Sequence, residues 1–205
     1  MIIHDVDQNT KEWWESRIGI PTASDFSKLI TSTGEPSKSM SDYAAVLAGN
    51  RYAKKSLDSW QGNYHTERGH EIEPEARNWY SFAYADVVQT GFITDDTEQY
   101  GCSPDGLVND DGLVEFKCLS AKEHVKALLY FNKHKKCPTT YVQQTQGQMF
   151  ICERKWCDLV FYHPDLPKLR IRQLPDSNII AGLKNQLDAV IKERDRILTI
   201  LNQFD

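Results

Sequence analysis

Alternation of apolar and polar side chains predicts the strands of this chain and locates its most unusual polar residues. In one run, Leu113, Glu115 and Lys117 fall on one face of an extended strand, and the intervening apolar residues fall on the other. An acid and an amine beside a leucine fill a core poorly, so they either pair at a wet surface or act together. The runs with strand character are 87–93, about 99–103, 112–118, 155–164 and 168–174.

Helical periodicity and capping residues predict helices before and after these strands. Asn9 followed by Glu12 is typical of a capping box, and the helix that it opens can end at Gly19. Thr22 with Asp25 predicts the start of a second helix. The other predicted helices are 42–56, 66–84 with a kink or fresh start at Pro74, 121–131 after the capping pair Ser120 and Glu123, 139–152, and about 177–203.

The order of these elements predicts the fold class. Helices come first, then a block of strands, a helix, two more strands and a last helix, which predicts an α/β or α+β domain with one mixed sheet and helices on both faces. Residues 31–41, rich in Ser, Gly and Pro, predict a surface loop. We expect a single domain over 1–205. The last helix has an apolar stripe of Ile180, Leu183, Leu187, Val190, Ile191, Leu198 and Leu201.

Charge does not decide which class of partner the protein binds. The 24 Lys and Arg against 29 Asp and Glu give a net charge of −5, which argues weakly against nucleic acid. That inference weakens where the acids bind metal or lie far from a local basic face. Local basic clusters occur at 54–55, at 133–136, and at the alternating Lys168, Arg170 and Arg172.

Cysteine spacing and the apolar runs argue against several other classes. Five cysteines, at 102, 118, 137, 152 and 157, lack CxxC spacing and indicate free, mostly buried thiols rather than disulfides or a zinc site. The six scattered histidines also argue against zinc. No apolar run approaches the roughly 18 residues of a membrane span, and the first nine residues are too acidic and short for a signal peptide. We therefore expect a cytoplasmic protein.

The stretch CSPDGLVNDDGLVEFKC, residues 102–118, carries the candidate chemistry. Asp105 lies on a turn, and a hairpin of this length brings it alongside the face that bears Glu115 and Lys117. Two carboxylates and a backbone carbonyl at one point suit a hard ion such as Mg²⁺. A neighbouring lysine can orient a water or stabilise an attacked phosphate, so the set fits metal-assisted phosphodiester hydrolysis. Glu-x-Lys alone is more often a surface ion pair.

Three further motifs accompany this stretch in a fixed order. They are WWESRIGIPTASDFSKLI, RGHEIEPEAR and YVQQTQGQMFICERKWCDLVFYHP, and with CSPDGL…GLVEFKC they span about 13–164. Together they resemble the lambda-exonuclease branch, or YqaJ-type viral recombinases, of the PD-(D/E)xK nucleases. The resemblance implies a restriction-endonuclease-like fold in which helices flank a central mixed β-sheet.

The resemblance also implies catalytic roles. Asp105 and Glu115 would be side-chain metal ligands, with the Phe116 carbonyl completing the set. Lys117 would position and activate the attacking water, and Glu73 would serve a second metal or its waters. Two Mg²⁺ ions per site are implied, with Mn²⁺ as a substitute.

A phosphate-binding pocket is expected between the first two helices. Arg17 and Ser24 provide a guanidinium, a hydroxyl and helix-start N–H groups, which suit a terminal phosphate. The matching residues of the family bind the 5′-phosphate of a DNA end. The sequence departs from the family in the 31–41 loop, which lacks a further phosphate-binding arginine and offers Lys38 as the nearest basic residue.

Four other residues are expected along the DNA cleft. Gln144 and Gln146, on one helical segment, would line it with Gln144 closest to the chemistry, and Tyr141 would lie beside them. Trp13 either stacks on a terminal base or belongs to the core.

The implied function is Mg²⁺-dependent 5′→3′ degradation of linear double-stranded DNA, which leaves 3′ single-stranded overhangs for phage-type recombination. The implied partners are a single-strand-annealing protein and two more copies of the chain in a trimeric ring. No iron–sulfur cluster is expected, because the first cysteine comes only at Cys102. Two alternatives remain: a structure-specific or restriction-type endonuclease on the same fold, and a DNA-end-binding recombination module without catalysis.

Overall fold

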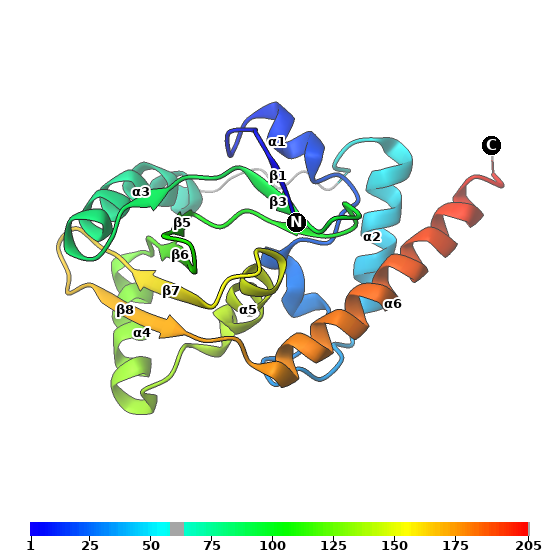
Figure 1. Ribbon diagram of the computed structural model, residues 1–205. Coiled ribbons are helices and arrows are strands. Elements are labelled where there is room, and N and C mark those ends of the chain that lie inside the picture. Colours follow the sequence, from blue (N-terminus) through cyan, green and yellow to red (C-terminus); the bar gives the residue numbers. More distant parts are fainter. Residues whose placement is uncertain (58–63, 205) are drawn as a thin grey trace.

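The computed structural model describes residues 1–57 and 64–204, and for 64–70 it describes the backbone alone. Its main element is a five-stranded mixed sheet in the order β2-β5-β6-β7-β8 (Figure 1). β6 and β7 are parallel, whereas the other neighbouring strands are antiparallel. The strands of this sheet are β2 (Val87–Val88), β5 (Gly106–Val108), β6 (Gly112–Lys117), β7 (Trp156–Phe161) and β8 (Leu169–Gln173).

A second sheet of three strands corrects the prediction of one sheet. Its order is β1-β3-β4, with β1 at Ile2–His4, β3 at Phe92–Thr94 and β4 at Gly101–Cys102. The predicted strand 87–93 is therefore divided between the two sheets. The division falls near Gly91, where an added Cβ would lie 1.8 Å from the Val6 carbonyl oxygen, so the N-terminal segment passes directly over the backbone there.

The helices follow the predicted order with shifted ends. Ser120 accepts a hydrogen bond from the Glu123 N–H and opens its helix as predicted. The first helix is capped by Thr10 rather than Asn9, and the segment after Thr22 is a 3₁₀ helix whose Thr22 side chain makes no cap bond. The helices are α1 (Lys11–Ser16), η1 (Ala23–Lys28), α2 (Met40–Ala53), α3 (Tyr64–Ala83, containing Pro74), α4 (Ala121–His134), η2 (Thr139–Tyr141), α5 (Val142–Ile151) and α6 (Ser177–Leu201).

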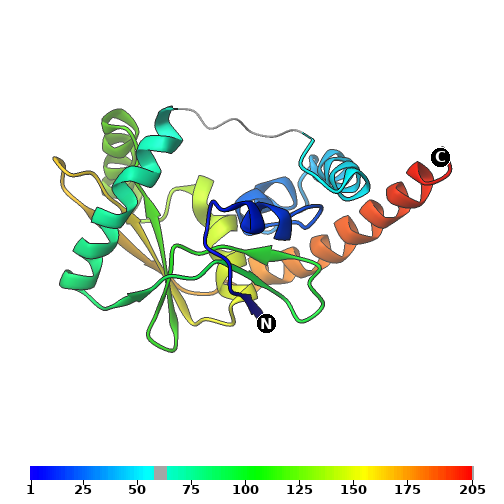
Figure 2. The ribbon, with the colours of Figure 1, turned by 90° about the horizontal axis from the view of Figure 1, so that it is seen from above.

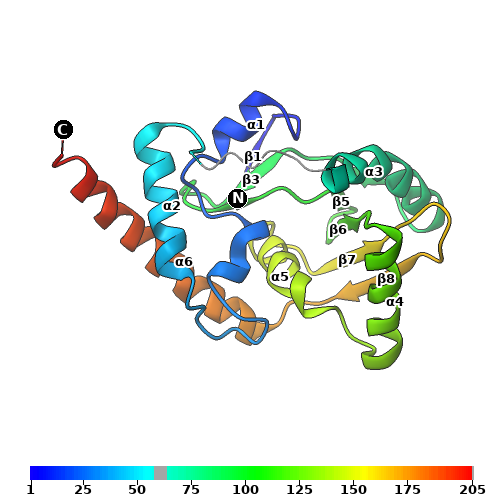
Figure 3. The ribbon, with the colours of Figure 1, turned by 180° about the vertical axis from the view of Figure 1, so that it is seen from behind.

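Helices cover both faces of the five-stranded sheet (Figures 1 and 3). α3 packs on the face that carries Val114 and Phe116 of β6. α4 packs on the opposite face, where its Ala127 belongs to one hydrophobic cluster with Leu159 and Phe161 of β7. The period-two alternation predicted for β6 is thus confirmed, and it leaves Glu115 on the α4 and α5 side. The described residues include no helix long and apolar enough to cross a membrane.

Two basic residues of β8 balance a buried carboxylate. Asp158 of β7 is fully buried and accepts hydrogen bonds from the Tyr80 hydroxyl (2.6 Å), Arg170 (3.1 Å) and Arg172 (2.8 and 2.9 Å). Burial alone would raise the pKa of Asp158, but these donors hold that pKa below its usual value. Arg170 and Arg172 of β8 therefore stabilise the sheet by compensating a buried charge.

α6 packs along α2 at the end of the molecule away from α3 and α4 (Figure 2). Its stripe buries Leu183, Leu187 and Val190 as predicted, but it begins with Ile179 rather than Ile180. One turn further along, the buried position is occupied by Arg194, which is fully buried.

Arg194 connects α6 to two distant segments. Its guanidinium donates to the Gly19 carbonyl (3.0 Å) and to the Gln99 Oε1 (2.7 Å), and its Nε donates to Asp195 (2.8 Å). Buried polar groups require such partners, because an unsatisfied one costs about 1–3 kcal/mol. Arg194 thereby fixes the turn that follows α1.

We predict that Arg194→Met lowers the free energy of unfolding by about 2–4 kcal/mol, because two buried oxygens lose a charged donor. Urea denaturation measures this change. Arg196→Met is the matched control, since Arg196 is 60% exposed and pairs with Glu193 on the surface, and it should change stability by less than about 0.5 kcal/mol. Equal effects of the two substitutions would contradict the role of Arg194.

Candidate active site

Glu115 is a buried carboxylate on the central strand of the sheet. It is 4% exposed and lies on the face of β6 that α5 covers. Its Oε1 accepts hydrogen bonds from Lys117 Nζ (2.8 Å) and Gln144 Nε2 (2.6 Å), and its Oε2 accepts one from Gln148 Nε2 (2.7 Å). Three donors thus compensate the cost of burying this charge.

Lys117 and Gln144 close a ring of hydrogen bonds with Glu115. Lys117 Nζ also donates to Gln144 Oε1 at 3.0 Å and lies 5.2 Å from the centre of the Tyr141 ring. Burial alone would lower the pKa of Lys117, but the Glu115 and Asp105 carboxylates outweigh burial and raise that pKa. Lys117 is therefore an ammonium that donates hydrogen bonds.

Asp105 is held beside this ring by the backbone. Its Oδ2 accepts a hydrogen bond from the Phe116 N–H at 2.6 Å, which fixes the turn before β5 against β6. Burial, followed by the nearby charges of Glu115 and Glu73, raises the pKa of Asp105 well above its usual range. Several carboxylates lie near one another with too little positive charge, so a bound cation would stabilise the site.

The carboxylate oxygens of this site suit a hard divalent ion. In the described part of the chain, no three His, Cys, Asp or Glu side chains form a ready-made ion cage. Mg²⁺ does not need one, because it commonly binds one or two carboxylates and fills its other positions with waters and substrate phosphate oxygens. Asp105 and Glu115 are the two carboxylates that would serve in this way, and their ligand roles, like that of the Phe116 carbonyl, stay predictions.

One cavity brings together residues from all four sequence motifs. It has a volume of 160 Å³ and contains the predicted residues Arg17, Ser24, Glu73, Asp105 and Gln144 in its wall. A wider hollow of 650 Å³ shares part of this wall. The lining of the smaller cavity is Gln8, Asn9, Trp13, Arg17, Thr22, Ala23, Ser24, Glu73, Ser103, Asp105, Gln144 and Gln148.

Hydroxyl groups surround Arg17 at one end of this cavity. Its guanidinium donates to Ser103 Oγ (3.1 Å) and Thr22 Oγ1 (3.4 Å), and Thr22 Oγ1 lies 3.1 Å from Ser24 Oγ. Burial lowers the pKa of Arg17 from its very high usual value, which leaves the group charged. Sequence reasoning missed Ser103, although it stands two residues before Asp105 in the same motif.

Of the two alternatives for Trp13, the structure supports the core role, and stacking on a terminal base stays a prediction. It is 7% exposed, so it belongs mostly to the core, yet part of it lines the cavity. Its Nε1 donates to Ser103 Oγ at 2.8 Å, and the Arg17 guanidinium lies 4.2 Å from the centre of its ring. Trp13 therefore supports Arg17 by a cation–π contact.

Glu73 lies in the cavity wall and is also paired along its own helix. Its Oε1 accepts a hydrogen bond from Arg77, one turn later in α3, at 2.5 Å. The role predicted for Glu73 at a second metal ion or its waters stays a prediction. Arg68 and Gly69, which belong to the same motif, lie outside the residues whose side chains are described.

Several predicted residues are not part of the cavity lining. Glu115 and Lys117 reach it through Gln144, which hydrogen-bonds to both, and Tyr141 lines a different hollow.

Gln146 does not line this cavity: it is 4% exposed, donates to the Leu174 carbonyl (2.9 Å) and accepts from the Asp176 N–H (2.7 Å). Gln148 takes the expected place, because residues four apart on a helix share a face and residues two apart do not. Lys38 is exposed and outside the cavity wall, so the missing arginine is not replaced there.

Comparisons with known proteins bear on the fold and the family of the chain. A family model described as the YqaJ-like viral recombinase domain matches residues 12–155. An alkaline exonuclease from Laribacter hongkongensis superimposes with a TM-score of 0.82 and 32% identity, over 95% of this chain and 97% of that chain. The complex of that exonuclease with dAMP gives the same values. No curated protein matches the chain.

A phage-related exonuclease from Haemophilus somnus 129PT is more distant, with a TM-score of 0.70 and 15% identity over 89% of this chain and 96% of that chain, and it supports the fold alone. The expected architecture, a mixed sheet flanked by helices, is confirmed by the structure and by these matches. The family model covers more than half of the sequence and includes Arg17, Asp105, Glu115 and Lys117. The chain belongs to the YqaJ-like viral recombinase domain family.

Proposed function

We propose that this protein is a metal-dependent exonuclease that degrades the 5′ strand of linear double-stranded DNA in the 5′→3′ direction. The products would be mononucleotides and 3′ overhangs for recombination with a single-strand-annealing protein. One observation carries the proposal: Arg17 with its hydroxyl partners and Asp105 line the same 160 Å³ cavity, and Gln144 and Gln148 of that lining donate hydrogen bonds to Glu115. Family membership and the similarity to an alkaline exonuclease support a nuclease role.

The proposed roles of the residues follow from their contacts. Asp105 and Glu115 would hold Mg²⁺, or Mn²⁺ in its place, and Glu73 would serve a second ion. When bound there, the ion would supply Lewis-acid activation of water and of the attacked phosphate. Lys117 would orient the attacking water and stabilise the developing charge, and Gln144 would keep Lys117 aimed at this point.

The direction of attack would follow from the anion-binding end of the cavity. Arg17 with the Ser24 and Ser103 hydroxyls offers a charged donor and two neutral ones to a terminal phosphate. A 5′-phosphate held there would place the next phosphodiester toward the carboxylates. An endonuclease on the same fold would cut circular DNA as well as linear DNA, and an end-binding module would cut neither.

Loss of either catalytic charge should abolish cleavage. We predict that Lys117→Ala and Asp105→Ala each lower the cleavage rate at least about a hundredfold. Lys117→Ala should leave DNA affinity nearly unchanged, because its role lies in the attack, whereas Asp105→Ala should also weaken Mg²⁺ binding. Digestion of a fluorescent linear duplex, with Mg²⁺ present or chelated, measures the rates. Chelation should stop digestion.

Lys155→Ala is the matched control, because Lys155 is 75% exposed and pairs with Asp111 on the surface. It should keep the unmodified rate. Retention of most activity by Lys117→Ala would remove Lys117 from the mechanism.

A 5′-phosphate should accelerate digestion, and Arg17→Ala should remove the preference. The reason is that the half-buried Arg17 guanidinium can form a charge-assisted pair with the phosphate that a 5′-hydroxyl end lacks. Initial rates on otherwise identical 5′-phosphorylated and 5′-hydroxyl duplexes give the ratio. Equal rates on both ends with the unsubstituted protein would overturn the pocket assignment.

We also predict a closed homotrimer that surrounds DNA. A chain with net charge −5 gains little from general attraction to a polyanion, and enclosure would keep it on DNA through many cleavage events. Light scattering should give about three times the 23.6 kDa chain mass. A monomeric mass combined with release of DNA after each cleavage would contradict the ring.

A further inference from the structure

A groove outside the cavity lies between α1 and the C-terminal end of α2. Its volume is 540 Å³. Its floor is mostly apolar, and lysines lie at its rim. Lys54 has a left-handed backbone (φ 53°) and ends α2, so the chain turns there and brings Lys55 beside α1. The lining of this α1–α2 groove is Lys11, Trp14, Glu15, Ile18, Lys54, Lys55 and Ser56.

Trp14 is the prominent side chain of the groove. It is 51% exposed, which is unusual for so large an apolar surface. Its ring meets the Trp13 ring edge to face, with centres 4.6 Å apart at 77°. Trp13 in turn supports Arg17 in the cavity wall. The Trp14 and Trp13 side chains thus connect the groove to the part of the cavity where Arg17 lies.

The charge of the groove contrasts with that of the whole chain. Three lysines and one glutamate line it, and Glu15 is already paired with Lys11 at 3.3 Å. Lys54 and Lys55 are exposed at the rim. Lysines at the rim of a groove with an aromatic floor are the combination that binds single-stranded nucleic acid. The lysines neutralise phosphates, and an unpaired nucleobase stacks on the aromatic ring.

We propose that the α1–α2 groove binds single-stranded DNA, namely the uncut strand at the processed DNA end. This inference rests on the proposed function, since digestion of one strand is what leaves its complement unpaired. Trp14 contacts Trp13, and Trp13 contacts Arg17, which lines the same cavity as Asp105, so the groove would lie next to the end of the strand being cut. Trp14 would stack on a base of the complement, and Lys54 and Lys55 would contact its phosphates.

Binding without cleavage tests this proposal. The probe is a labelled 5′-hydroxyl single strand of about 20 nucleotides, with divalent ions chelated and affinity measured by fluorescence anisotropy at several salt concentrations. Trp14→Ala should weaken binding about tenfold, and Trp14→Phe should keep most of the affinity. The double variant Lys54→Ala/Lys55→Ala should make the plot of log affinity against log salt concentration less steep by about 1.4. Each phosphate that a lysine no longer neutralises lowers the steepness of that plot by about 0.7.

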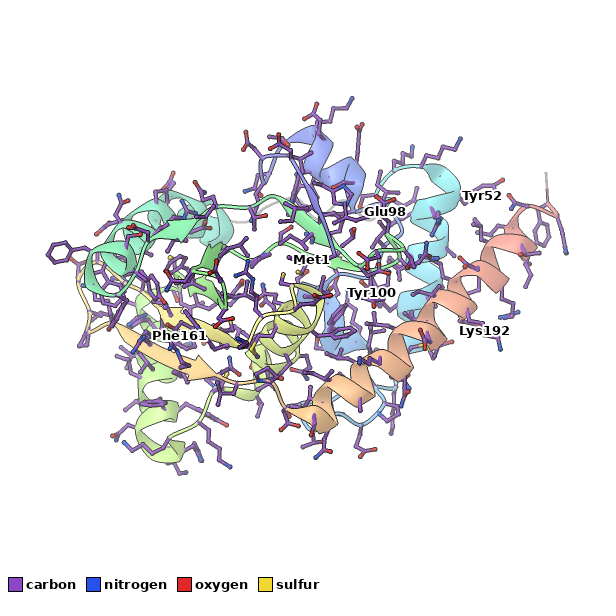
Figure 4. The ribbon with its side chains drawn as sticks, in the orientation of Figure 1. Met1, Tyr52, Glu98, Tyr100, Phe161 and Lys192 are labelled. Atoms are coloured by element: carbon purple, nitrogen blue, oxygen red, sulfur yellow. The ribbon has the colours of Figure 1, made fainter. Side chains whose placement is uncertain are left out.

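Matched controls come from other exposed positions of the same type. Phe82→Ala, on α3, removes an aromatic ring that is 94% exposed. Lys192→Ala removes a lysine that projects from α6 (Figure 4). Both controls should bind the strand as the unsubstituted protein does.

Two results would overturn the proposal. One is unchanged strand binding in both Trp14→Ala and the double lysine variant. The other is a Trp14→Ala variant that has a lower oligomer mass but binds as much single-stranded DNA per chain as the unsubstituted protein. That result would mean that the groove is a contact between copies of the chain. If Trp14→Ala fails to fold, the exposed double lysine variant decides alone. Duplex digestion by the unsubstituted protein, measured separately, reports on the nuclease proposal whatever the strand-binding result.

Discussion

The burial of one carboxylate, Glu115, constrains most of the site. A charge that is 4% exposed on a central strand is tolerated only where donors replace its water, and here β6 provides Lys117 and α5 provides Gln144 and Gln148. α5 must therefore lie close over β6. Gly147 lets it also lie close to η1, because a Cβ there would come within 2.4 Å of the Phe26 ring.

That close packing brings together two groups of residues that favour opposite charges. η1 and the turn after α1 present Arg17 and hydroxyl groups, which favour an anion, whereas the raised pKa of Asp105 marks a place that favours a cation. Arg194 fixes the same turn from the far side of the molecule. Under the proposed function, a phosphodiester together with a divalent ion would satisfy both groups at once.

The sequence predicted those parts that local rules determine. Alternation in β6 was enough to put Glu115 and Lys117 on one face, and the Pro-Asp-Gly turn was enough to bring Asp105 to them. It did not predict the second sheet, because its strands are short and β1 pairs with β3 across about 90 residues, which leaves no local signal. Arg194 was missed because a stripe defined by apolar residues passes over an arginine on the same helix face. Gln146 was taken from the resemblance, whereas residues four apart on a helix share a face, so Gln148 joins Gln144 at Glu115.

The central claim is that Asp105 and Glu115 jointly hold the ion that activates phosphodiester hydrolysis. Anomalous diffraction from crystals soaked in Mn²⁺ measures this directly, because the ion is located without reference to activity. The expected result is an anomalous peak within bonding distance of both carboxylates, which disappears in Asp105→Asn crystals soaked in the same way. A peak that contacts neither carboxylate, or one that persists unchanged in Asp105→Asn crystals, would contradict it.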